Sequence, residues 1–89
     1  ATWYWTGVGN CGAHSVDTDY IVALSTAEYN NGSHCWKHIT VCYEGKTIDA
    51  TVVDSCPSCS QYSIDLSPSA FEALAPRSKG RIQVSWNYV

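Results

Sequence analysis

Cysteine is the residue that most constrains this chain, because five cysteines occur in only 89 residues. A chain of this length buries roughly 60–65% of the surface that its unfolded form exposes, so its hydrophobic core alone gives a small margin of stability. Disulfides add stability, and they form in oxidising compartments rather than in the cytosol. The sequence therefore predicts one secreted, extracellular domain over residues 1–89. The start at Ala1 and the lack of methionine fit a mature chain whose signal peptide has been removed.

Charge and hydropathy argue against two classes of partner. Five basic residues stand against eight acidic ones, and the net charge of −3 lacks the basic surface that a phosphate backbone requires. No apolar run approaches the roughly 20 residues that cross a bilayer, and no basic amphipathic stretch suggests membrane anchoring. We therefore expect no nucleic-acid partner and no membrane partner. Asn31-Gly32-Ser33 is a glycosylation sequon, and the sequence leaves its use open.

Short strands dominate the predicted secondary structure. Thr2 to Trp5 and Tyr20 to Leu24 are short runs of apolar, β-branched and aromatic residues. His38 to Tyr43 and Lys46 to Asp54 flank a Glu-Gly pair, which is typical of a hairpin. Arg81 to Trp86 alternates apolar and polar residues and predicts a final strand. About six strands in all favour a small closed barrel, since closure removes exposed sheet edges.

Two short helices interrupt the strands. Ser25 with a glutamate three residues later is a capping pattern, and it predicts a helix through Tyr29. Ser67-Pro68 is a good helix start because proline at the first helical position loses only an amide that has no partner there. We expect this second helix to run to about Leu74, with Ser67 and Ser69 acting as caps rather than nucleophiles.

Alternation along the second hairpin arm predicts where its carboxylate lies. Ile48, Ala50, Val52 and Asp54 are separated by two residues each, so they share one face of the strand. Asp54 is therefore expected to end the apolar face.

The cysteines allow more than one chemistry. Cys56 and Cys59 have the spacing of metal ligands or of a redox pair, and Cys35, His34 and His38 could complete a zinc site. The secreted character favours disulfides over both, so we expect no metal and no other cofactor.

The sequence also suggests surface roles for the histidines and a buried place for one thiol. His14, His34 and His38 are predicted to be surface or hydrogen-bonded residues, because no nucleophile accompanies them at a catalytic spacing. Cys42 lies in a predicted strand and is expected to be a small buried residue, which favours a monomer over a disulfide-linked pair.

Five segments in order resemble one known family. The chain is similar over its whole length to the double-psi β-barrel domain of expansin-like proteins, above all to the single-domain loosenins. Rare-lipoprotein-A-like domains and kiwellins are more distantly similar. The segments that carry the resemblance are Ala1-Thr2-Trp3-Tyr4, Gly9-Asn10-Cys11-Gly12, Val22-Ala23-Leu24-Ser25, Val53-Asp54-Ser55-Cys56-Pro57-Ser58-Cys59 and Ile64-Asp65-Leu66-Ser67-Pro68-Ser69-Ala70-Phe71.

This resemblance implies a fold and a set of site residues. It implies a mainly β, six-stranded double-psi β-barrel with one or two short helices and an open groove for an extended polysaccharide. Its groove-floor residues correspond to Thr2, Asp54 and Asp65. It also implies that two disulfides are made by Cys11, Cys35, Cys56 and Cys59. We expect the first two of these cysteines to pair one each with the last two.

Aromatic side chains would complete the groove. Trp3, Tyr4 and Trp5 are consecutive, so at least one ring must face outward from a strand. Exposed rings are flat apolar surfaces for sugars, and the expected stacking residues are Trp3, Trp5 and Tyr62, with Tyr29 and Trp36 as further candidates.

The resemblance implies binding of cell-wall polysaccharide, such as cellulose or chitin, which the protein would loosen without hydrolysis. Double-psi endoglucanases use two carboxylates, and their acid corresponds to Asp65, but Thr6 stands where their base would be. Asp54 is the other carboxylate available. An alternative is weak glycan cleavage with Asp65 as general acid and Asp54 as its companion. Another is a protein-binding module, such as an inhibitor of a papain-like cysteine protease.

Overall fold

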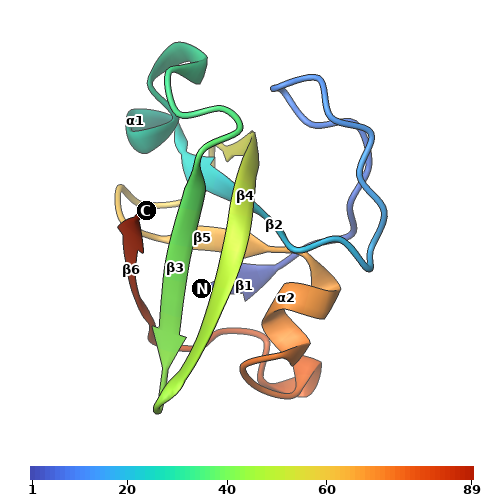
Figure 1. Ribbon diagram of the computed structural model, residues 1–89, viewed down its shortest axis with the longest axis vertical. Helices are drawn as coiled ribbons and strands as arrows, with labels where there is room; N and C mark the ends of the chain where they lie inside the picture. Colours follow the sequence, from blue (N-terminus) through green and yellow to red (C-terminus); the bar gives the residue numbers. More distant parts are fainter.

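The structure is a computed structural model that describes all residues 1–89, and it is mainly β. Two short α-helices and two single 3₁₀ turns lie between the six strands along the chain (Figure 1). In chain order the elements are β1 (Thr2–Trp3), β2 (Ile21–Ser25), α1 (Thr26–Tyr29), η1 (Asn30–Gly32), β3 (His38–Tyr43), β4 (Lys46–Cys56), β5 (Ile64–Leu66), α2 (Pro68–Glu72), η2 (Arg77–Lys79) and β6 (Ser85–Tyr88). None of the helices is both long and apolar enough to span a membrane.

All six strands join one mixed sheet in the order β1-β5-β2-β4-β3-β6. β1 is parallel to β5 and β2 is parallel to β4, while the other three pairings are antiparallel. The two ends of this order approach each other, because the Ala1 amino group and the Ile82 amide each donate a hydrogen bond to the other residue's carbonyl oxygen. This contact links the start of β1 to the segment before β6. The expected mainly β, six-stranded architecture is confirmed.

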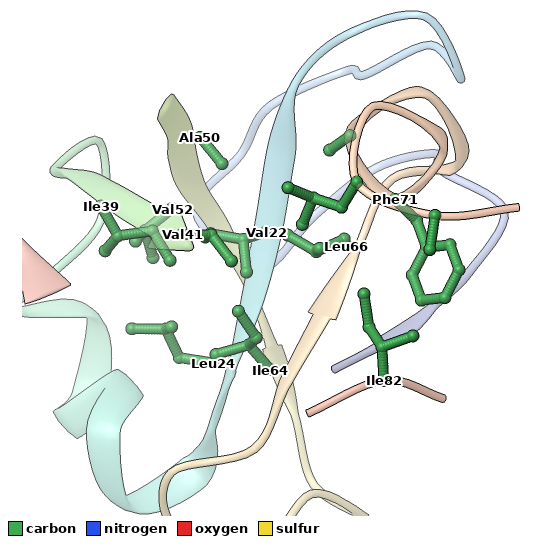
Figure 2. Packing of buried hydrophobic residues seen from close by; sticks show 13 residues of the cluster. Val22, Leu24, Ile39, Val41, Ala50, Val52, Ile64, Leu66, Phe71 and Ile82 are labelled. Carbon is green, nitrogen blue, oxygen red and sulfur yellow. The ribbon is translucent and has the colours of Figure 1, made fainter. Parts of the chain in front are cut away.

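A single hydrophobic core of 13 buried residues fills the interior. Val22 and Leu24 of β2 lie at its centre, next to Leu66 and Ile64 of β5 (Figure 2). Phe71 of α2 packs near Ile82 at one end of the cluster and is fully buried (Figure 2). The helix therefore covers one end of the sheet, and Figure 1 shows α1 at the other.

Local sequence signals set the turns and caps as expected. Glu44 and Gly45 both have positive φ, at 45° and 82°, which matches the right-handed twist of the hairpin arms β3 and β4. The Ser25 hydroxyl accepts the Glu28 amide at the start of α1. The Ser67 hydroxyl accepts the Ala70 amide at the start of α2, with proline at the first helical position. Ser69 lies inside this helix rather than at its cap.

Several predicted boundaries move because pairing partners, not propensity, decide where a strand ends. The first strand stops at Trp3 since β5, its only neighbour, ends at Leu66. The last strand runs from Ser85 to Tyr88 instead of from Arg81 to Trp86, because only these residues lie beside β3. Arg81 to Val84 carry Ile82 into the core outside the sheet. β5 has three residues, too few for a visible alternation.

The predicted face of Asp54 is wrong, and a register shift explains why. Val22 lies opposite Val52, but the next residue, Ala23, lies opposite Asp54, so Val53 is an extra residue in β4. An extra residue reverses the alternation of a strand. Since Val52 points into the core, Asp54 points to the other side of the sheet.

The predicted disulfide pairing is also wrong. Cys11 pairs with Cys35, and Cys56 pairs with Cys59. The Cys11 amide donates to Val53 and the Trp36 amide donates to Val52, so these two loops meet beside the same stretch of β4. Cys56 and Cys59 close a single turn, in which their Cα atoms are 5.4 Å apart. The disulfide of Cys11 therefore joins its loop to the Cys35 loop, and neither loop is bonded to the Cys56–Cys59 turn.

Cys42 is the one free cysteine, and it is half-buried rather than buried. It alternates with the buried Val41 along β3 and so faces away from the core. Asn31 of the sequon is exposed in η1. The histidines are exposed or hydrogen-bonded as expected: His38 meets the Asp49 carboxylate, and His34 meets the Glu28 carbonyl.

Candidate functional site

Two of the three predicted groove-floor residues are in direct contact. Thr2 of β1 lies opposite Asp65 of β5, and its hydroxyl donates a 2.8 Å hydrogen bond to Asp65 Oδ1. Asp65 also lies opposite Ala23 of β2, which in turn lies opposite Asp54 of β4. Residues opposite each other in a sheet point to the same side. The four residues therefore form one row across four strands, with the small Ala23 between the two carboxylates.

The Thr2–Asp65 pair opens into a cavity of about 200 Å³. Arg81, the Cys56–Cys59 disulfide and three serines complete its lining: Ser58, Ser60 and Ser63. No aromatic ring lines this cavity, and Asp65 is the only carboxyl group in it. The cavity is thus a polar, hydroxyl-rich hollow at one end of the row.

Asp65 is held in a partly dehydrated environment. Burial raises the pKa of its carboxyl above the ordinary value. The Thr2 hydrogen bond and the nearby Arg81 charge act in the opposite direction, because both favour the carboxylate. Asp54 adds a small upward effect. A carboxyl with a raised pKa can hold a proton at higher pH and donate it to a bound hydroxyl or ether oxygen.

Asp54 has a different set of partners. Its Oδ1 accepts the backbone amides of Asn10, at 2.9 Å, and Ser55, at 2.8 Å. The side chain of Asn10 also reaches the Ser55 hydroxyl. Asp54 therefore fixes the Asn10 loop against β4, at the far end of the row from Thr2.

Tyr4 belongs to this site and was missed by the sequence analysis. Burial raises the pKa of its hydroxyl, and the negative charges of Asp54 and Asp65 raise it further. The signal was present in the sequence: Tyr4 follows Thr2 by two residues, and alternate residues of an extended chain point to the same side.

Trp3 and Trp5 lie on another surface. Trp3 packs partly against the core, and its indole nitrogen donates to the Arg77 carbonyl. Trp5 is 64% exposed and meets Trp3 edge to face, with ring centroids 5.1 Å apart. The Arg77 guanidinium lies 5.3 and 5.4 Å from the two ring centroids. The rings are thus already engaged by a cation.

Tyr62, the third predicted stacking residue, is 69% exposed and lines a different cavity, of about 400 Å³, next to β6. Tyr29 is half-buried, with its hydroxyl 3.5 Å from the sulfur of Cys35. The predicted aromatic residues therefore do not converge on the Thr2–Asp65 cavity.

Trp36 marks a third surface. It is 55% exposed and has a φ of +69°, which is unusual for a bulky residue. Hydrogen bonds from its amide to Val52 and from the Val52 amide to Lys37 hold it in this conformation. Trp36 and Tyr20 line a cavity of about 460 Å³ together with His14. We call the exposed residues Tyr20 and Trp36, which line this cavity, the Trp36 surface; they lie on two loops that the Cys11–Cys35 disulfide joins.

Thr6, which the resemblance aligned with the base of double-psi endoglucanases, binds a carboxylate. Its amide and hydroxyl both donate to Asp17 Oδ1. These two hydrogen bonds lower the pKa of the Asp17 carboxyl. Asp17 therefore anchors the loop between β1 and β2 to Thr6.

The mixed six-stranded sheet and its polar row agree with a double-psi β-barrel protein. The chain belongs to the double-psi family whose model is described as "Lytic transglycolase", which matches residues 1–86. This finding confirms the expected fold family, to which expansins are related by structure.

Two kinds of relative resemble the chain in detail. The "Papain inhibitor" of Streptomyces mobaraensis is 40% identical over 96 residues, covering 97% of this chain and 67% of that protein. The structure of the Streptomyces papain inhibitor superposes with a TM-score of 0.90 at 36% identity, covering 99% of this chain and 88% of that one. A variant of Clavibacter michiganensis expansin, solved in complex with cellohexaose, superposes with a TM-score of 0.89 at 29% identity.

The two relatives differ in how much of them the chain matches. The superposition with the expansin includes 99% of this chain but only 47% of the expansin chain, so that expansin is about twice as long. The chain thus corresponds to about half of the expansin and to most of the papain inhibitor structure.

Proposed function

We propose that this protein is a secreted inhibitor of papain-like cysteine proteases. One observation carries the proposal: the likeness to the Streptomyces papain inhibitor extends over nearly the whole of both chains. Two disulfides in so small a domain fit an extracellular protein that must withstand proteolysis. Protease binding stood as an alternative in the sequence analysis, and it has more support than polysaccharide loosening.

The Trp36 surface is the proposed contact with the protease. Exposed apolar residues that gather on one face mark interaction sites, and tryptophan is enriched where binding energy concentrates. The Cys11–Cys35 disulfide and the hydrogen bonds of Trp36 hold both loops before binding. Such preorganisation lowers the entropic cost of association.

An inhibition assay tests this function. Wild-type protein is titrated against papain with a peptide substrate, together with Trp36→Ala and the matched control Trp5→Ala. We expect wild type and Trp5→Ala to inhibit alike, because Trp5 lies on a different surface. Loss of a central tryptophan should raise the inhibition constant by about 30-fold. Absence of inhibition by the wild type would refute the function, and equal inhibition by both variants would place the contact elsewhere.

A second candidate function is binding of cell-wall polysaccharide along the row from Thr2 to Asp54. It is favoured by the Thr2–Asp65 hydrogen bond at the mouth of a hydroxyl-rich cavity, and by the similarity to an expansin that was solved with cellohexaose. Sugar hydroxyls pair well with serine, threonine and carboxylate groups. The proposal is binding rather than two-carboxylate hydrolysis, since Asp65 is the only carboxyl in the cavity.

Pull-down on insoluble cellulose and chitin tests this candidate. Asp65→Asn and Thr2→Val should reduce the bound fraction, whereas Asp49→Asn, an exposed carboxylate beside His38, should not. If the wild type stays in the supernatant with both polymers, this second candidate is wrong.

A further inference from the structure

We propose that the cavity beside β6 is a separate subsite for neutral sugar units. We call it the β6 subsite; its defining residues are Glu28, Tyr62, Trp86, Asn87 and Tyr88. The inference rests on the second candidate function above, and it places a sugar contact that the Thr2–Asp65 cavity does not include.

Three aromatic residues from two distant segments line this cavity. Trp86 and Tyr88 alternate along β6 and share one face, where their rings meet edge to face with centroids 5.3 Å apart. Tyr62 comes from the turn before β5, and the Trp86 indole nitrogen donates a 2.9 Å hydrogen bond to its carbonyl oxygen. This bond fixes the turn against β6, and the exposed Tyr62 lines the same cavity as Trp86 and Tyr88.

The Tyr88 ring is held in one orientation. The His34 ring stacks on it with centroids 4.6 Å apart and an angle of 17° between the planes. Its hydroxyl donates a 2.8 Å hydrogen bond to Glu28 Oε2. One side of Tyr88 is therefore covered by the protein, while about two-fifths of the residue remains exposed, at 39%.

The polar groups of the subsite indicate the class of ligand. Glu28 supplies a carboxylate beside the rings, and the tyrosines supply hydroxyls. Ser85 and Asn87 also line the cavity, but they alternate with Trp86 along β6, so their side chains point to the other face of the strand. A sugar ring has the matching combination, with an apolar face for aromatic contact and a rim of hydroxyls for hydrogen bonds. No lysine or arginine lines the cavity. A lone carboxylate disfavours acidic sugars and phosphates, so the ligand class is a neutral hexose or N-acetylhexosamine unit.

Volume and position agree with this assignment. The cavity measures about 400 Å³, which falls within the range of small-ligand sites, about 300–1,000 Å³. Ser60 and Ser63 line the Thr2–Asp65 cavity, and Tyr62 between them lines the β6 subsite. One short turn thus forms part of both cavities, and an oligosaccharide that crosses it can occupy both.

Nuclear magnetic resonance titration of isotope-labelled protein with cellohexaose or chitohexaose tests the subsite. Amide shifts at Tyr62 and at residues 84–88 are expected with at least one of the two sugars, and the responding sugar identifies the unit. Tyr62→Ala should raise the dissociation constant about five-fold, the loss expected from one ring contact. The matched control Tyr20→Ala removes an exposed tyrosine of the Trp36 surface and should bind as wild type does.

Other outcomes separate the subsite from the function on which it rests. Shifts confined to Thr2, Asp65 and their neighbours would overturn the subsite and leave polysaccharide binding standing. No shifts with either sugar would overturn both. Shifts at Tyr62 and residues 84–88 on adding inactivated papain, without any from the sugars, would overturn the subsite by making it a protein contact.

Discussion

At the residue scale, Thr2 and Asp65 balance two opposing effects on one carboxyl group. Burial raises the Asp65 pKa, and the Thr2 hydroxyl lowers it by donating to the carboxylate. The resemblance of the sequence to expansin-like proteins identified both residues. It did not reveal Tyr4, whose hydroxyl is influenced by Asp54 and Asp65 together. The expected sugar-stacking residues were the neighbouring Trp3 and Trp5, although alternation along the chain places Tyr4 on the same side as Thr2.

Removing the Thr2 hydroxyl should change the titration of Asp65 in a defined direction. Thr2→Val is expected to raise the Asp65 pKa further, because the charged form loses a hydrogen bond while burial remains. Carboxyl carbon chemical shifts followed against pH measure this change. Thr6→Val is the matched control: it should raise the pKa of Asp17, its own partner, and leave Asp65 unchanged. Equal Asp65 titration in Thr2→Val and wild type would contradict the prediction.

The stability of the fold should depend on pH through the raised pKa of Asp65. A carboxyl whose pKa is raised by folding binds its proton more tightly in the folded state, so Asp65 contributes stability as pH falls through its folded pKa and opposes folding above it. Asp65→Asn removes this titration. Its melting temperature relative to wild type should therefore be higher at pH 7 than at pH 3, in paired melts at the two pH values. A difference that grows on acidification would contradict this sign.

At the element scale, the extra residue in β4 decides the orientation of the site. Val53 has no partner in β2, yet its carbonyl accepts the Cys11 amide from the loop that crosses there. Gly9 of that loop is packed so closely that an added Cβ would lie 2.3 Å from the Val53 carbonyl oxygen. Strict alternation could not reveal this arrangement, because the loop contact that accompanies the extra residue comes from residues more than 40 positions away.

Gly9→Ala should therefore destabilise the protein. The new methyl group must push the loop away from backbone atoms of β4, at a cost of about 1–3 kcal/mol in the free energy of unfolding. Gly7→Ala is the matched control, since no atom lies within 4 Å of its Cβ position and its φ is not positive. Urea denaturation of both variants measures the difference. Similar midpoints for the two would show that the loop yields without cost.

At the scale of the whole molecule, the two disulfides stabilise different parts of the structure. Cys11–Cys35 spans 24 positions and joins the two loops of the Trp36 surface, whereas Cys56–Cys59 spans 3 and rigidifies one turn beside Asp65. The expected pairing was wrong because it depends on which loops meet over β4. Chain spacing holds no information about that meeting.

Removing each disulfide should reveal the difference. In the loop-entropy model the Cys11→Ser/Cys35→Ser double variant loses about 3.5 kcal/mol of stability, and the Cys56→Ser/Cys59→Ser variant loses about 2 kcal/mol. Thermal unfolding of both, with Cys42→Ser as a control that breaks no disulfide, measures the order. Papain inhibition should fall only in the Cys11→Ser/Cys35→Ser variant, because only that variant removes the disulfide that holds the two loops of the Trp36 surface together. The reverse order of stability would contradict this assignment.

By itself, the sequence determined the features that depend on neighbouring residues. The Glu44-Gly45 turn, the Ser25 and Ser67 caps and most of the strands follow from conformational preferences within a few positions. Only the tertiary structure decided the face of Asp54, the disulfide partners and the separation of the aromatic rings into three surfaces. These features depend on contacts between strands and loops far apart in the chain, where one extra residue reverses a face and pairing overrides local preference.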